Sequence, residues 1–254
     1  ADQYAQTGNA RRLAELLAPS GKRIRGGTKA AANTLLTVSQ AAFLCQPFTL
    51  MHQVGKLEGS LAQAETELNQ MARPFRVVRD QIVNAFAPFQ ADFPTDLDDS
   101  LQVEFRLIEW YYQNNQLIQA MSLAREWLID AVTYRLKKPL NFKIAARSPI
   151  ERAISGIDLV GREFFDNQIS RRRIFTPEDL NEYGRMIYDS WPECEAIKEL
   201  WSKLQPLRNG LDHAEHQEEG LNPATLSKGT HIKNIHKQSG EVMEQLRSLA
   251  RQWN

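Results

Sequence analysis

The chain has 254 residues, and its 31 Lys and Arg residues balance 31 Asp and Glu residues. A zero formal charge argues against a protein that coats nucleic acid through an overall cationic surface, because such binding depends on neutralising many phosphates. Any site for a polyanion must therefore be a local patch. With 42% hydrophobic and 24% charged residues, the composition is typical of a globular protein with a sizeable core.

The cysteine content and the apolar stretches bear on the compartment. Cys45 and Cys194 are the two cysteines, too few for a disulfide framework, so we expect a reducing cytoplasm and no redox or zinc-ribbon chemistry. The longest largely apolar stretch, residues 30–44, is interrupted by polar residues and is shorter than the roughly 20 residues that cross a bilayer. We expect no membrane-spanning segment. Because the chain opens at Ala1 without a signal-peptide pattern, we expect it to be part of a longer protein.

Apolar residues recur at spacings of three and four along most of the chain, which is the pattern of amphipathic helices. In the first part this spacing predicts helices over residues 9–17, 29–45, 57–71 and 78–86. The connection around Pro74 is short, so the last two should form an antiparallel hairpin. The loop 19–28 carries a first basic patch, which consists of Lys22, Arg23 and Arg25.

Residues 87–99 contain two prolines and four acidic residues, which suggests the major break in the chain. We therefore expect a helical accessory region of hairpins over 1–95 and a second helical domain over 96–254. In the second domain the same spacing predicts helices over 101–112, 117–131, 176–190, 191–206 and 232–253, with one more starting near Ser148. No strand-like alternation is evident, so the predicted fold class is all-α.

The residues best suited to catalysis or metal binding lie between Leu207 and His216. One interpretation is a solvated helix face, because Arg208 and Asp212, and again Asp212 and His216, stand four residues apart and can form ion pairs. A second is a metal site on His213 and His216. That site needs at least a third ligand, and His231 and His236 are available elsewhere in the chain.

A third interpretation is cleavage of a phosphodiester. A histidine can exchange a proton near neutral pH, and a guanidinium makes forked hydrogen bonds to phosphate oxygens. RNA supplies its own 2′-hydroxyl nucleophile, so Arg208 and His213 need only stabilise charge and move protons. Five residues correspond to a rotation of about 140° on a helix, so these two do not share a stripe. Asn209 does share a face with His213. A two-fold dimer would bring two copies of the pair into one cleft.

These residues resemble a known family. Arg208-Asn209-x-x-x-His213, preceded by Leu207, is similar to the R-x4-6-H signature of HEPN ribonucleases. The stretch from Trp110 to Glu126 resembles the helical hairpin, a short turn followed by QA-x-x-L-x-x-E, of the CRISPR-associated CARF–HEPN ribonucleases of type III systems. The likeness covers residues 100–254 better than the first 95.

The resemblance implies an all-α HEPN-type bundle that works as a homodimer in prokaryotic antiviral defence. It implies metal-independent cleavage of single-stranded RNA without a cofactor, with Arg208 and His213 as the catalytic pair and Asn209 as their polar companion. Glu126 would brace the motif helix, and Asp212 would support the site. The family also has a sensor domain for cyclic oligoadenylate, which we expect to be missing from this chain or to lie on another chain.

Further residues suit an RNA path. The triplet Arg171, Arg172 and Arg173 and the first basic patch provide cations, and Phe175 is a candidate for stacking on a base. A rival hypothesis from a different class is a helical adaptor, either an inactive HEPN relative or a TPR-like module, that binds a protein or a nucleotide.

Overall fold

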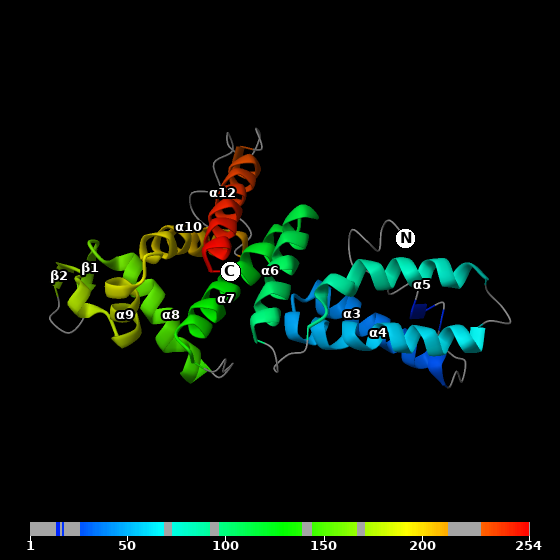
Figure 1. Cartoon of the computed structure of the whole chain (residues 1–254). Helices are drawn as coiled ribbons and strands as arrows, with labels where there is room; N and C mark the ends of the chain where they lie inside the picture. Colours follow the sequence, from blue (N-terminus) through cyan, green and yellow to red (C-terminus); the bar gives the residue numbers. More distant parts are fainter. Residues whose placement is uncertain are drawn as a thin grey trace. The chain divides into compact units, whose positions relative to one another are not determined.

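The computed structural model describes residues 14, 15, 17, 26–68, 73–91, 97–138, 144–166, 171–212 and 230–253. These residues are mostly helical (Figure 1), as the periodicity predicted. None of their helices combines the length and the apolarity that a membrane crossing requires. The chain divides into two compact units, 1–120 and 121–254. This division lies within helix α7 (Leu117–Arg135), whereas the sequence suggested a boundary at residues 95/96.

In the first unit, α3 (Gly27–Phe43) packs along α4 (Pro47–Leu68), and α5 (Arg73–Phe86) lies beside α4 (Figure 1). The bounds of α3 agree closely with the predicted helix 29–45. Small residues let α3 and α4 approach closely: a Cβ added to Gly27 would lie 2.8 Å from the carbonyl carbon of Gln63. The carboxylate of Glu67 caps α3 by accepting hydrogen bonds from the backbone N–H groups of Gly27, at 2.6 Å, and Thr28, at 2.9 Å.

Helix α6 (Leu97–Gln113) follows a short 3-10 turn, η1 (Ala87–Phe89), and α7 spans Leu117–Arg135. The predicted turn between these helices is confirmed, and its geometry matches that of the turn between α3 and α4. In each turn a non-glycine residue has a positive φ, 54° at Cys45 and 60° at Asn115. The next N–H reaches back to the preceding helix, from Gln46 to Ala41 and from Gln116 to Tyr111, each at 2.8 Å. Both turns are therefore Schellman-type C-caps.

In the second unit, α8 (Ile144–Leu159) leads into a two-stranded antiparallel hairpin, β1 (Glu163–Asp166) and β2 (Arg171–Ile174). The expectation of no strand is therefore wrong at this point. Each strand has only four residues, too few for alternation to stand out in the sequence. The triplet of arginines forms most of β2.

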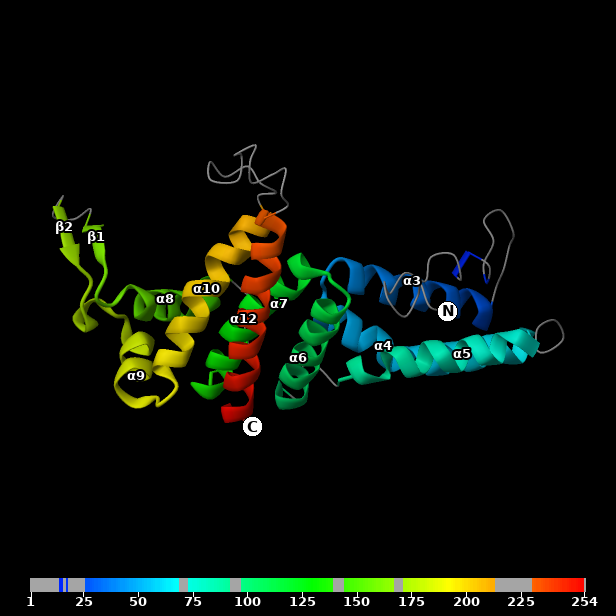
Figure 2. The same ribbon diagram turned by 90° about the horizontal axis from the view of Figure 1, so that it is seen from above.

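The predicted helix 176–190 is divided in the structure. Thr176 and Asp179 form a capping box around a 3-10 turn, η2 (Pro177–Asp179), and α9 (Glu182–Ser190) begins only after its own N-cap, Asn181. Helix α10 (Cys194–Asp212) continues through Pro206, where we expected it to end. Helix α12 (Thr230–Trp253) runs antiparallel along α10 (Figure 2), and it confirms the predicted helix 232–253.

Candidate functional site

Helix α10 positions Arg208 at the end of an apolar stripe. The stripe consists of buried residues at helical spacing: Ile197, Leu200, Trp201, Leu204 and Leu207. Arg208 follows Trp201 by seven residues, about 20° short of two full turns, so both side chains lie on the same face. Trp201 is fully buried, and Arg208 is half-buried. The guanidinium therefore lies at the edge of the core.

Asn209 interacts directly with this arginine. Its Oδ1 accepts a hydrogen bond from Nη1 of Arg208 at 3.3 Å. His213 and His216 lie outside the described residues, as does the side chain of Asp212, the last residue of α10. The structure thus describes the arginine and the asparagine of the predicted site, and the position of its histidine stays a prediction.

A cluster of charged side chains lies between α7, α8 and α10. Arg125 bonds Glu126 at 2.5 Å and also pairs with Glu151, while Arg147 lies 2.8 Å from Glu126 and 3.2 Å from Asp130. The guanidinium of Arg125 also covers the ring of Trp201 at 5.4 Å, within the range of a cation–π contact. Glu126, predicted to brace the motif helix, is therefore linked to α10 indirectly: it bonds Arg125, and Arg125 contacts Trp201 of α10.

This cluster was not predicted as a unit from the sequence. Glu126 and Asp130 are four residues apart on α7, and like charges at that spacing repel each other unless a cation lies between them. Arg147 supplies that cation. The two acidic residues on one face of a largely apolar helix were the signal for a nearby arginine.

Burial changes the acidity of Asp130. Its side chain is almost completely buried, and burial raises its pKa to about 6, with Arg147 opposing the shift and Glu126 adding to it. The charge of Asp130 therefore changes close to neutral pH.

The three arginines of the triplet have different surroundings. Arg173 bonds Asp166 at 2.7 Å and Asp179 at 2.6 Å, and it lies over the ring of Phe164 at 4.7 Å. The bond from Arg173, together with the backbone N–H of Thr176, lowers the pKa of Asp179. Arg171 and Arg172 are exposed, and Arg172 approaches Glu163 at 3.4 Å. Arg173 is therefore bound by two carboxylates of its own unit, whereas Arg171 and Arg172 face solvent; RNA binding by the triplet stays a prediction.

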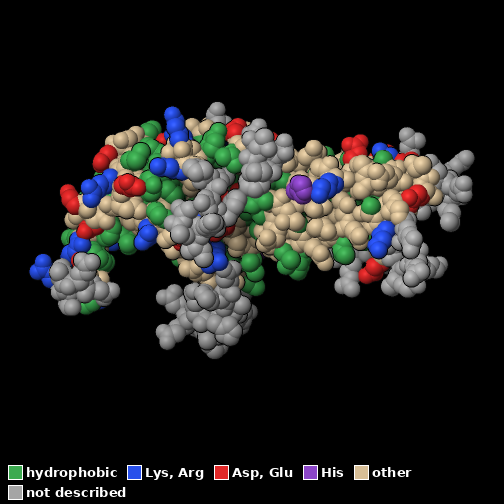
Figure 3. Space-filling model, turned by 90° about the horizontal axis from the view of Figure 1, so that it is seen from below, with side chains coloured by type: hydrophobic (Ala, Val, Ile, Leu, Met, Phe, Trp, Pro, Cys, Tyr) green, Lys and Arg blue, Asp and Glu red, His purple; other side chains and the backbone are tan. Residues whose placement is uncertain are grey.

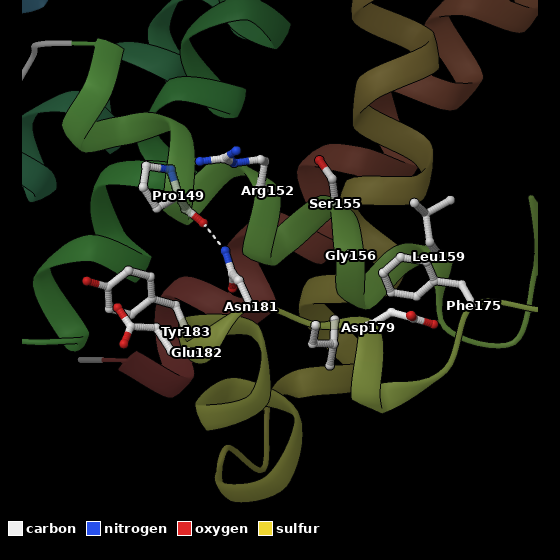
Figure 4. A pocket seen from close by; sticks show the side chains of 11 residues that line it. Pro149, Arg152, Ser155, Gly156, Leu159, Phe175, Asp179, Asn181, Glu182 and Tyr183 are labelled. Carbon is white, nitrogen blue, oxygen red and sulfur yellow. Dashed lines mark hydrogen bonds between the residues drawn. The ribbon is translucent and has the colours of Figure 1, made fainter. Parts of the chain in front are cut away.

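A cavity of about 520 Å³ lies between α8 and the segment from Phe175 to Tyr183 (Figure 4). Arg152, Ser155 and Leu159 line it from α8. The Asn181 side chain, which caps α9, donates a hydrogen bond to the carbonyl of Pro149 at 2.7 Å. Phe175, predicted to stack on a base, forms part of the wall and packs edge-on against Phe164 at 5.3 Å.

The remaining predictions concern cations and metals. The first basic patch, Lys22, Arg23 and Arg25, lies outside the described residues. On the face in Figure 3, Lys and Arg side chains are dispersed among Asp and Glu wherever the structure describes them. Within those same residues no group of three or more His, Cys, Asp or Glu side chains is arranged to hold a metal ion; His213 and His216 are not among them.

Comparison with family models, curated proteins and solved structures found no match to this chain.

Proposed function

We propose that this protein is a HEPN-type endoribonuclease that cleaves single-stranded RNA without a metal ion. Its site consists of Arg208, His213 and Asn209, which two-fold symmetry in a homodimer duplicates in one cleft. The observation that carries the proposal is the half-buried guanidinium of Arg208, held by Asn209 on the buried face of α10, five residues before His213. The resemblance to CRISPR-associated ribonucleases further suggests antiviral defence under the control of a separate cyclic-oligoadenylate sensor.

The placement of Arg208 suits stabilisation of negative charge. A guanidinium at the edge of a core is partly desolvated, so its attraction for a phosphate oxygen is stronger than in bulk water. Its contact with Asn209 restricts the side chain and reduces the entropy that binding must remove. The two residues thus prepare a site for the phosphate at the bond to be broken.

The proposed reaction needs no external nucleophile. The 2′-oxygen of the ribose attacks the neighbouring phosphorus, the bond from phosphorus to the 5′-oxygen breaks, and a 2′,3′-cyclic phosphate and a 5′-hydroxyl result. One proton leaves the 2′-hydroxyl and another reaches the departing 5′-oxygen. His213 from the two copies supplies the base and the acid, and Arg208 neutralises the charge on the phosphate.

The test is cleavage of a labelled single-stranded RNA in the presence of EDTA. We expect cleavage by the wild type and a loss of at least about 10²–10³-fold in the rate for Arg208→Ala and for His213→Ala. Asn209→Ala should reduce the rate less. An RNA with 2′-deoxyribose at the cleavage site should remain intact, because the nucleophile is absent.

His216→Ala and Arg251→Ala are matched controls, since each removes the same side-chain type from outside the proposed site, and both should cleave normally. Uncut RNA at micromolar wild-type protein favours the helical adaptor instead. Cleavage that EDTA abolishes favours the metal site on His213 and His216.

A further inference from the structure

We propose that the β1–β2 hairpin binds the single-stranded RNA substrate along its outer face, with Phe165 stacking on a base and Arg172 contacting a phosphate, while the exposed Arg171 at the end of β2 contacts a neighbouring phosphate. This inference rests on the proposed function, because it names the surface that holds the same substrate. It assigns a role to an element that projects from the helices of its unit (Figure 2).

The strand register determines which side chains share a face. Phe165 pairs with Arg172, and Glu163 pairs with Ile174. Directly opposed residues of an antiparallel pair lie on the same side, so these four form one face. That face is open to solvent: 55% of Phe165, 60% of Ile174 and 73% of the Arg172 side chain are exposed.

The other face of the hairpin holds it in place. Phe164 packs against Phe175, and Arg173 bonds both Asp166 and Asp179. An isolated two-stranded hairpin is marginally stable at best in water, and these contacts with the following segment fix its base. These contacts therefore hold the outer face, which carries Phe165 and Arg172, in a fixed position.

The chemistry of this surface fits a nucleic acid strand better than a protein partner. Arg173 satisfies the two acidic residues Asp166 and Asp179. The exposed charges of the two strands are therefore Arg172 and Glu163 on the outer face, and Arg171 at the end of β2, which pairs with Asp166 on the other face. The exposed pair of Arg172 and Glu163, at 3.4 Å, contributes little and can yield to a phosphate. A solvent-exposed ring directly opposite an arginine provides both stacking and charge, the two components of single-strand binding.

The experiment measures RNA affinity by fluorescence anisotropy at several salt concentrations. The full chain carries His213→Ala throughout, so that the RNA stays intact. We expect Phe165→Ala to raise the Kd about tenfold. Phe165→Tyr should restore binding, whereas Phe165→Leu should not, because leucine keeps the apolar surface and loses the ring.

The double variant Arg171→Ala/Arg172→Ala should weaken binding and reduce the slope of log Kd against log salt concentration by about 1.4, since each single-strand phosphate contact contributes about 0.7. Lys29→Ala/Lys56→Ala is the matched control. It removes the same charge from exposed positions on α3 and α4, and it should leave both Kd and slope unchanged.

Two results would overturn the inference. In one, the Phe165 and arginine variants bind RNA as the parent does; in the other, Phe165→Ala changes the oligomeric state and leaves the Kd unaltered, which identifies a protein interface. Cleavage assays on the variants that keep His213 distinguish failure of the hairpin inference from failure of the nuclease proposal. If Arg208-dependent cleavage persists while hairpin variants bind normally, only the hairpin inference fails. If the hairpin binds RNA and no form cleaves it, only the nuclease proposal fails.

Discussion

The α3–α4 pair of the first unit and the α7–α8–α10 region of the second bury their helix faces with different side chains. The buried face of α3 consists of small and aliphatic residues together with Thr28 and Ser39, and it includes no ionisable side chain. The second region buries Trp201 under Arg125 and encloses Asp130 beside Arg147. Close packing of small residues gives a rigid support, whereas buried charges cost stability and are retained where their charge has a use. The two regions should therefore respond to different substitutions, the first to changes in side-chain volume and the second also to changes in charge.

The largest effect on stability should come from Trp201→Ala. The side chain is fully buried, so its removal leaves a large cavity and also ends the cation–π contact of Arg125. We expect a loss of about 3–5 kcal/mol in the free energy of unfolding, measured by urea denaturation. Trp201→Phe, which retains a ring for Arg125, should lose clearly less. Equal losses for both variants would show that the ring retained in Trp201→Phe does not stabilise the fold through its volume or its contact with Arg125.

Asp130→Asn should change how stability depends on pH. The folded protein holds the proton of Asp130 up to a pKa of about 6, whereas the unfolded chain releases it near pH 4, so the folded state binds more protons between these values. This group therefore lowers stability as pH rises from about 4 to 6, by on the order of 2–3 kcal/mol. The asparagine variant should lack that decline in denaturation measured at successive pH values. A wild type and a variant with parallel pH profiles would contradict the assignment.

Gly27→Ala tests the close approach of α3 and α4. The new Cβ would meet the backbone of Gln63 at 2.8 Å, and a backbone cannot turn aside, so we expect a loss of about 1–3 kcal/mol. Gly59→Ala is the matched control on α4. No atom lies within 4 Å of its new Cβ, and removing a helical glycine should stabilise by about 0.5–1 kcal/mol. Changes of opposite sign in the free energy of unfolding of the two variants would confirm that α3 and α4 approach closely at Gly27.

The smallest effect should come from Glu67→Gln at the start of α3. Hydrogen bonds from Thr28 and Gly27 lower the pKa of the Glu67 carboxyl, so its contribution is present at neutral pH and is lost as pH falls through the folded pKa. This slope is opposite to that of Asp130. The glutamine variant should show a slightly lower Tm at pH 7, and its difference from the wild type should shrink at low pH. If the difference in Tm grows at low pH instead, the carboxylate of Glu67 does not stabilise the start of α3.

Periodicity predicted most helices because each buries one face, and burial leaves the same trace in the sequence wherever it occurs. The predicted helix bounds were wrong where capping hydrogen bonds or tertiary packing decided where a helix begins or ends. At Thr176 the capping signals belong to a 3-10 turn, and Asn181 starts the helix. At Pro206 the tertiary packing of α10 outweighs the lost hydrogen bond of the proline.

In the candidate site, too, some features could be predicted from the sequence and others could not. The spacing of Arg208, Asn209 and His213 could be read directly, since they are neighbours in the chain. The roles of Arg171, Arg172 and Arg173 could not, because three identical residues in succession differ only in the face on which a strand places them.

The order of residues by itself determined the helical class, the turn at Asn114 and Asn115, and a motif of chemically suitable residues near the end of the chain. These depend on contacts within a few residues. Only the tertiary structure decided that Arg173 is taken up by two carboxylates, that Phe165 faces solvent, and that Arg125 links three helices. Partners distant in sequence determine the surroundings of a charge, and periodicity within one helix or strand contains no record of them.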